Sequence, residues 1–222
     1  MKAKVKKATI SVLSTVLIIM IALAAYSSIS AASVNVVHEQ EEIKVFVGNL
    51  DNTNILNRQL FLDKRKAVIE NFGRENPEGL SKVLITFNRF LTADEAEKLL
   101  GGNEKNVVID EIFISIPNEI GRSIIVSSGQ GNIRDEIEQE LNIMIKNEND
   151  AEIKAEHERM KTEYGVFAVS FEADNKTISE ISKSKDIRFT DMFYYPEAEE
   201  KSNKTGKKVS YIALPQKPDG TY

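Results

Sequence analysis

The order of strand-like and helix-like segments between residues 82 and 195 most constrains the fold of this chain. Apolar alternation predicts strands at 82–90 and 107–116, with a helix between them. After a long helical insertion come a third strand, a short helix and a last strand that ends at Tyr195. Strands and helices that alternate in this way pack as helices against one face of a sheet. The sequence therefore predicts an α+β fold.

Local signals mark the helix boundaries in this region. Thr92 and Glu95 form a capping box, in which the hydroxyl and the carboxylate bond to otherwise free backbone N–H groups. Gly101 can take the left-handed conformation that ends a helix. The insertion begins near Asn132 and consists of two charged helices with a polar break at 147–150. Without it the order is the split βαβ order, so we expect a ferredoxin-like antiparallel sheet with helices on one face and a long helical insertion.

The flanking segments complete the expected domain. The patterns predict a strand at 42–50, a helix at 60–71 that Gly73 and the Asn76-Pro77 pair end, a charged turn region at 196–205 and an edge strand at 209–214. We expect one α+β domain over residues 42–214, a tether at 33–41 and a flexible tail at 215–222.

The first 32 residues have the three parts of a secretory signal: a basic start with four lysines, an apolar block and a small-residue end. Signal peptidase would cleave between Ala32 and Ser33. An uncleaved segment would instead anchor the chain in the membrane through residues 8–25. In both cases the lysines stay in the cytoplasm and the rest of the chain faces outward, so we expect a membrane-attached or secreted protein.

The amino-acid composition excludes several classes of protein for the part of the chain that follows residue 32. The chain has no cysteine, which excludes a lipidated N-terminal cysteine and disulfide bonds. A cysteine-free chain rich in Lys, Glu, Ile and Asn is typical of an exported protein of a Gram-positive bacterium. Without residues 1–32 the chain has 25 basic and 34 acidic residues, a net charge of −9. That balance argues against nucleic acid and against anionic lipid surfaces as partners.

One stretch resembles a known family. The strand Gly165–Phe171, the short helix around Ile178–Ile181 and the closing strand at Asp186–Phe189 are similar to the inhibitor-I9 family, the propeptide-like domains of subtilisin-type proteases. The resemblance implies a peptidase as one partner class. The family joins its second and third strands by a tight connection, whereas here the helical insertion separates them.

Three polar features are weighed as chemical sites. The loop from Ser128 to Asn132 has two glycines but lacks the third glycine of a dinucleotide fingerprint, so we interpret it as a turn with Asn132 as helix cap. His157 has no second histidine four residues away, as a zinc site of the metalloprotease type would need, and we expect it at the surface.

The third feature is Asp191, which alternates with the apolar residues Ile187, Phe189 and Phe193. It faces either the core, near a lysine, or an exposed edge, and we expect the edge. We predict no catalytic, cofactor-binding or metal-binding residue.

An apolar stripe on the first insertion helix is the candidate partner contact. It consists of Ile133, Ile137, Leu141 and Met144. The stripe either binds a partner or packs on the sheet, and we expect packing because a core-facing helix requires such a stripe.

Three functions follow from these features. The first hypothesis is a non-catalytic extracytoplasmic protein that contacts an unknown protein partner at the cell surface, through a sheet edge or a helix face, as a peptidase inhibitor would. The alternative is a membrane-anchored sensory or regulatory ligand-binding domain. A hydrolase comes third, because no nucleophile, base and metal constellation stands out.

Overall fold

The computed structural model describes residues 38–39, 42–49, 55–101, 106–119, 123–128 and 132–218. In chain order they form β1 (His38–Glu39), β2 (Glu42–Val47), α2 (Ile55–Glu75), β3 (Leu80–Leu91), α3 (Ala93–Leu100), β4 (Val108–Ser115), β5 (Ile124–Ser127), α4 (Ile133–Asn147), α5 (Ala151–Glu163), β6 (Gly165–Asp174), α6 (Asn175–Ile181), β7 (Ile187–Met192), α7 (Pro196–Thr205) and β8 (Lys208–Ala213). The predicted α+β class is confirmed. No helix in these ranges is long and apolar enough to cross a membrane. The predicted signal or anchor at residues 1–32 lies outside the described residues.

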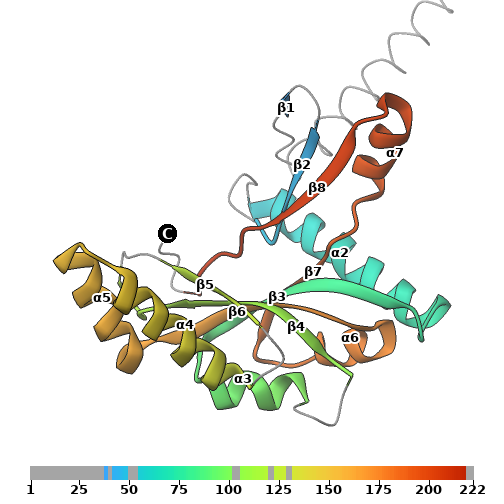
Figure 1. The fold of residues 1–222 in the computed structure, drawn as a ribbon. Helices are drawn as coiled ribbons and strands as arrows, with labels where there is room; N and C mark the ends of the chain where they lie inside the picture. The colour runs from blue at the N-terminus through green and yellow to red at the C-terminus, as the bar shows by residue number, and fades with distance from the viewer. Residues whose placement is uncertain are drawn as a thin grey trace, which may run out of the picture.

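The larger sheet has five strands in the order β5-β4-β6-β3-β7, and every neighbouring pair is antiparallel (Figure 1). The alternation of its strands places Val83, Ile85 and Phe87 of β3 in one buried cluster, as predicted. This first core cluster also contains buried side chains of α3, α4 and α6. These three helices therefore cover one face of the sheet, below it in Figure 1.

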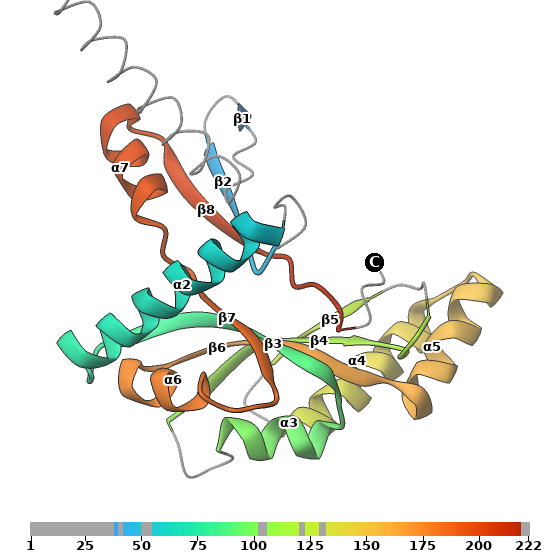
Figure 2. The same cartoon turned by 180° about the vertical axis from the view of Figure 1, so that it is seen from behind.

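A second, smaller sheet lies on the opposite side of the five-stranded sheet (Figure 2). Its order is β1-β2-β8, and β2 and β8 run parallel with Ile43 opposite Val209. Ile43, Val45 and Val47 of β2 are fully buried, and with Phe167 and Phe189 of the larger sheet they form a second core cluster. The sequence prediction did not include this second sheet, because its two main strands come from opposite ends of the described chain.

Helix α2 connects the two clusters across the edge of β7. Phe61 belongs to the second core cluster and Ile69, two turns later, to the first. Figure 2 shows α2 running between the small sheet and α6, along the strand β7 that ends the large sheet. A helix that covers an edge strand hides backbone groups that would otherwise pair with another chain.

Two elements differ from the sequence prediction. Helix α2 begins at Ile55, earlier than the expected residue 60, and it continues past Gly73 to Glu75, where the Asn76-Pro77 pair follows it as predicted. Residues 196–205 were expected to be a turn region and form α7 instead. Pro196 stands in the first turn and Gly206, with φ of 69°, ends the helix in the left-handed conformation. Proline in the first turn and glycine just after the last turn are both helix signals, but the charged residues between them led to the prediction of a turn region.

The other local signals are confirmed. Thr92 and Glu95 make both hydrogen bonds of the capping box, and Gly101 ends α3 with φ of 95°. Asn132 caps α4, and Asp150, the last residue of the polar break, caps α5. The described part of the segment expected to be a flexible tail, residues 215–218, packs on β7: Lys217 is buried, and Arg188 donates to its carbonyl oxygen.

The capping box gives a direct test of local stability. Changing Thr92 to Ala removes the acceptor for the Glu95 N–H, so we expect the free energy of unfolding to fall by about 1 kcal/mol. Urea denaturation measures the change. The control is Thr162→Ala in α5, where the hydroxyl bonds only to a carbonyl of its own helix. A loss as large in the control as in Thr92→Ala would contradict the assignment.

Candidate functional site

The apolar stripe of α4 lies in the core. Ile133, Ile137 and Leu141 are fully buried in the first core cluster, and Met144 is half-buried against it. Side chains without exposed surface are not accessible to a partner in the folded protein. The stripe therefore packs on the sheet, which is the alternative favoured by the sequence.

His157 was expected at the surface, and this expectation is wrong. The residue is 5% exposed, and its Nδ1 has no hydrogen-bond partner within the described ranges. His157 and Met160 are the two buried residues of α5, three positions apart, so they mark the face of the helix that turns inward. Two such residues on a charged helix give too short a stripe to reveal that face from the sequence.

Asp191 was expected at an exposed edge, and this expectation is also wrong. The side chain is fully buried and accepts three hydrogen bonds. Arg65 Nε lies 2.6 Å from Oδ1, while the Gly48 N–H and the Tyr195 hydroxyl lie 2.8 Å and 2.6 Å from Oδ2. The donors come from α2, from the end of β2 and from the start of α7. This carboxylate therefore joins the small sheet and two helices to the large sheet.

The Arg65 guanidinium makes hydrogen bonds to the backbone in addition to its bond with Asp191. The residue is 4% exposed, and its Nη2 donates to the carbonyl oxygens of Met192 at 2.8 Å and Tyr194 at 3.0 Å. The guanidinium also lies over the ring of Tyr195, 4.1 Å from the centroid. Arginine suits this place because its planar fork can bind several acceptors and stack on an aromatic ring at once.

The electrostatics of the cluster keep Tyr195 protonated. Burial raises the pKa of the Tyr195 hydroxyl well above its ordinary value, and the negative charge of Asp191 raises it further. The hydroxyl thus remains a donor to Asp191 throughout the neutral range. Because every polar group of the cluster has a fixed role, the arrangement acts as a structural cross-link. We call Arg65, Asp191, Tyr195 and the Gly48 N–H the buried network.

Sequence reasoning missed three members of this network. Arg65 stands between Phe61 and Ile69 at helical spacing, which is a charged residue inside an apolar stripe and could have pointed to a buried ion pair. Gly48 has φ of 82°, and a Cβ there would meet the Leu84 side chain at 2.5 Å. Tyr195 has no comparable signal in the sequence.

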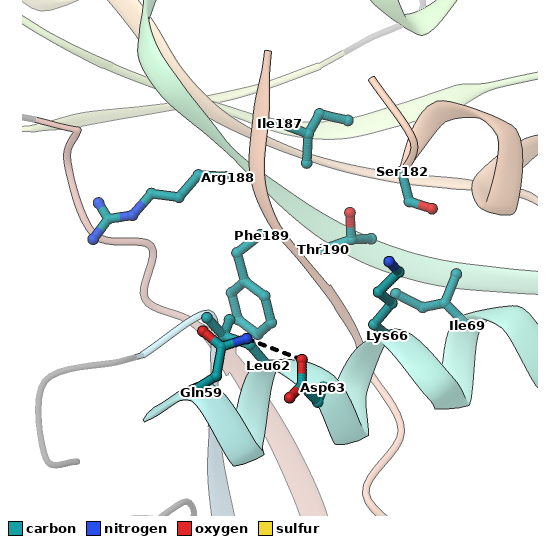
Figure 3. Close-up of a pocket in the computed structure, with 10 residues that line it drawn as sticks. All are labelled: Gln59, Leu62, Asp63, Lys66, Ile69, Ser182, Ile187, Arg188, Phe189 and Thr190. Atoms are coloured by element: carbon teal, nitrogen blue, oxygen red, sulfur yellow. Dashed lines mark hydrogen bonds between the residues drawn. The ribbon is translucent and has the colours of Figure 1, made fainter. Parts of the chain in front are cut away.

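A pocket opens beside the network, between α2, β7 and the end of α6 (Figure 3). Its cavity volume is about 270 Å³. The floor is buried and consists of Ile69, Phe189 and Thr190, whereas Asp63 and Lys66 lie exposed at the rim. We call this site the α2–β7 pocket.

One polar atom of this floor has no partner. Thr190 is 7% exposed, and its buried Oγ1 has no hydrogen-bond partner in the described part of the chain. A buried hydroxyl without a partner is unfavourable, and because this oxygen has almost no exposed surface it does not open into the pocket.

A second surface is the outer face of the small sheet. Phe46 of β2 is paired with Ile212 of β8, and both point away from the buried side chains of β2. Ile212 is 37% exposed and Leu214, two residues later, is 48% exposed. Among the described residues, β8 is the last strand in the order of this sheet. We call Phe46, Ile212, Leu214 and the adjoining edge the β8 surface.

Within the described ranges, no three His, Cys, Asp or Glu side chains converge in a way that could hold a metal ion. Comparisons of the chain with models of protein families, with curated proteins and with solved structures found no match. The chain itself defines an α+β protein whose two sheets and helix α2 are joined by the buried network.

Replacing Asp191 with Asn tests the buried network. The amide leaves the Arg65 charge buried without a counter-ion, so we expect the free energy of unfolding to fall by about 3–5 kcal/mol. Chemical denaturation measures the loss. The matched control is Asp94→Asn, because Asp94 pairs with Arg134 at the surface and is 70% exposed. The control should lose less than about 1 kcal/mol, and equal losses would contradict a special role for Asp191.

The raised pKa of Tyr195 gives a prediction at alkaline pH. Below about pH 10 the wild type should be more stable than Tyr195→Phe by about 1.5–3 kcal/mol, because the hydroxyl bonds to a charged group. Above that pH the tyrosine ionises in the unfolded chain but not in the native one, so this advantage should shrink as pH rises. Urea unfolding of both proteins at a series of pH values measures the difference. A gap that stays constant or widens would contradict the prediction.

Proposed function

We propose that this chain is a non-catalytic extracytoplasmic protein that acts by contact with another protein at the cell surface, and that the β8 surface makes the contact. The N-terminal signal or anchor is the basis for the location. Of the two contact surfaces considered from the sequence, the helix stripe is occupied by core packing. A sheet edge therefore becomes the better candidate.

The observation that carries this proposal is the pairing of exposed apolar side chains with an edge strand. Ile212 and Leu214 are exposed, and Phe46 lies across from Ile212 on the same face. An edge strand can pair its backbone with an extended segment of a partner, while pockets and apolar side chains beside it give specificity. No proline interrupts residues 208–214, so the backbone N–H groups needed for such pairing are present.

The fold supports a peptidase as the partner class. We infer a ferredoxin-like architecture, because without β5 the order β4-β6-β3-β7 and the linking helices α3 and α6 follow the split βαβ pattern. The helices α4 and α5 are then an insertion between the second and third strands of that pattern. The inhibitor-I9 resemblance of Gly165–Phe189 falls on its second half and implies a peptidase partner.

A ligand-binding sensory or regulatory domain is the second candidate function. The α2–β7 pocket favours it, because a cavity of about 270 Å³ there has a buried floor and carries Asp63 and Lys66 at its rim. The two candidates use different surfaces and can be tested separately.

Site-specific crosslinking tests the contact through β8. The chain has no cysteine, so Ile212→Cys carries a single attachment point for a photoreactive maleimide. Illumination of cells that export the labelled protein should give one discrete crosslinked species. The matched control is Ile125→Cys on β5, one of the two edge strands of the large sheet in the described residues, where the isoleucine is 51% exposed.

The control position should give no crosslinked species. With the recovered partner, Ile212→Asp should weaken binding by about tenfold or more, because a charge replaces an apolar contact, while Ile125→Asp should not. Equal crosslinking from both positions, or from neither, would contradict the assignment of the β8 surface.

A further inference from the structure

Among the described residues, β8 forms a long sheet edge that no other element covers. The strand orders leave edges at β1 and β8 of the small sheet and at β5 and β7 of the large one. β1 has two residues and β5 has four, and α2 runs along β7 (Figure 2). β8 has six residues, contains no proline and keeps a regular register with β2. Proteins usually block an edge of this length, because an exposed strand pairs with other chains.

The backbone groups that face this edge belong to alternate residues of β8. The Leu214 N–H donates to the Val47 carbonyl of β2. Polar groups alternate between the two edges of a strand, so Val209, Tyr211 and Ala213 direct their N–H and C=O groups away from β2. The Tyr211 hydroxyl donates to Glu199 of α7 at 2.6 Å on the buried side of the sheet. Helix α7 therefore covers that face of the small sheet and leaves the edge open.

A second copy of the chain matches these backbone groups. A two-fold axis at Tyr211 places this residue opposite its own counterpart and Val209 opposite Ala213, which pairs every outward-facing residue of both strands. On the exposed face, Ser210 then lies opposite Ile212. A register shifted by two residues toward the C-terminus would set Val209 against Pro215, which has no N–H to donate.

The charge distribution permits this contact between two acidic chains. The small sheet and α7, residues 38–39, 42–47 and 196–213, carry five acidic and five basic residues, a net charge of zero. Within β8 the charged residue is Lys208. In the two-fold register it lies opposite Leu214, and the two copies of Lys208 are about 20 Å apart along the strands. That separation exceeds the distance of about 8 Å over which salt screens charges.

The size of the contact predicts a weak dimer. One pair of short strands buries less than the roughly 1,600 Å² of a standard stable interface, so we expect a Kd of about 10–100 µM in solution. Attachment of both copies to one membrane raises their effective concentration without any new contact. A protein partner that binds the same edge more tightly displaces the second copy.

We propose that, when no partner occupies it, the β8 edge pairs antiparallel with the β8 edge of a second copy of this chain, with Tyr211 at the two-fold axis. The pairing joins two small sheets into one continuous sheet and covers the bare edge. A partner that adds a strand needs the same backbone groups, so the dimer and the partner complex exclude each other. This regulation rests on the proposed contact through β8, whereas the dimer is testable without a partner.

Sedimentation equilibrium of the exported protein, purified from cells that express the full chain, tests the dimer. Ala213→Pro should raise the Kd about tenfold or more, because it removes an N–H that faces the second copy and none that bonds to β2. The matched control is Ile125→Pro. The Ser128 N–H bonds to Asp110 of β4, so the Ile125 N–H, three residues earlier, faces the free edge of β5. The control should leave the Kd unchanged, and thermal unfolding checks that both variants are folded.

Cysteine pairs test the register, since the chain has no cysteine of its own. Directly opposed residues of a pair without mutual hydrogen bonds have Cα atoms about 4.5 Å apart, within disulfide range. A mixture of Ser210→Cys and Ile212→Cys should therefore form a disulfide dimer on mild oxidation. Each variant alone should form little, because its two cysteines lie diagonally, about 7–8 Å apart. Mixtures of either variant with Ile125→Cys are the control and should also form little.

Three results would overturn the proposal. They are a wild-type protein that stays monomeric at about 1 mM, a Kd that Ala213→Pro leaves unchanged in a folded variant, and a mixture that gives no more disulfide dimer than its two variants give separately. Each of these leaves the crosslinking expected from Ile212→Cys in cells unaffected. Loss of that crosslinking while the purified protein still dimerises would instead refute the β8 contact with a partner, so the two failures can be told apart.

Discussion

The buried ion pair between Arg65 and Asp191 lies where α2, the small sheet and α7 meet the large sheet. Asp191 stands on the last strand of the large sheet and receives hydrogen bonds from α2, from the end of β2 and from the start of α7. The small sheet meets the large one at the second core cluster, and the Gly48 N–H bond fixes the position of β2 in that contact. A purely apolar contact could slide, whereas three donors that converge on one carboxylate define a single arrangement.

The geometry of the pair also explains why the charges can be buried. Removing an arginine and an aspartate from water is costly, and their attraction offsets that cost only where the remaining donors and acceptors are also bonded. Here both Asp191 oxygens are bonded, and the Arg65 guanidinium reaches two backbone carbonyls as well as the carboxylate. Those carbonyls belong to Met192, the last residue of β7, and to Tyr194 just after it, and β7 has no further strand beside it in the described sheet. The same arginine therefore stabilises an edge and sets the register of α2 along it.

Features that depend on neighbours in the sequence could be predicted, and those that depend on distant partners could not. The capping box at Thr92 and the buried stripe of α4 follow from spacings of three and four residues. Asp191 was misplaced because its partner, Arg65, is 126 positions away. Ile187 was expected to share a face with Phe189, but a register shift between β3 and β7 turns Ile187 toward the first core cluster. The pocket was not predicted at all, since its lining comes from three elements that meet only in the fold.

The buried network also relates the two proposed surfaces. Asp63 and Lys66 of the pocket flank Arg65 on α2, and Thr190 precedes Asp191 on β7, so a ligand that bridges helix and strand holds the same two elements that the ion pair joins. The β8 surface is part of the small sheet, whose strand β2 ends at Gly48, the third donor to Asp191. Binding that stabilises the contact between α2 and β7 therefore also stabilises the position of the small sheet on the large sheet. If a partner at the β8 surface stabilises the same position of the small sheet, then by linkage it raises the affinity for the ligand by the same factor as the ligand raises the affinity for the partner.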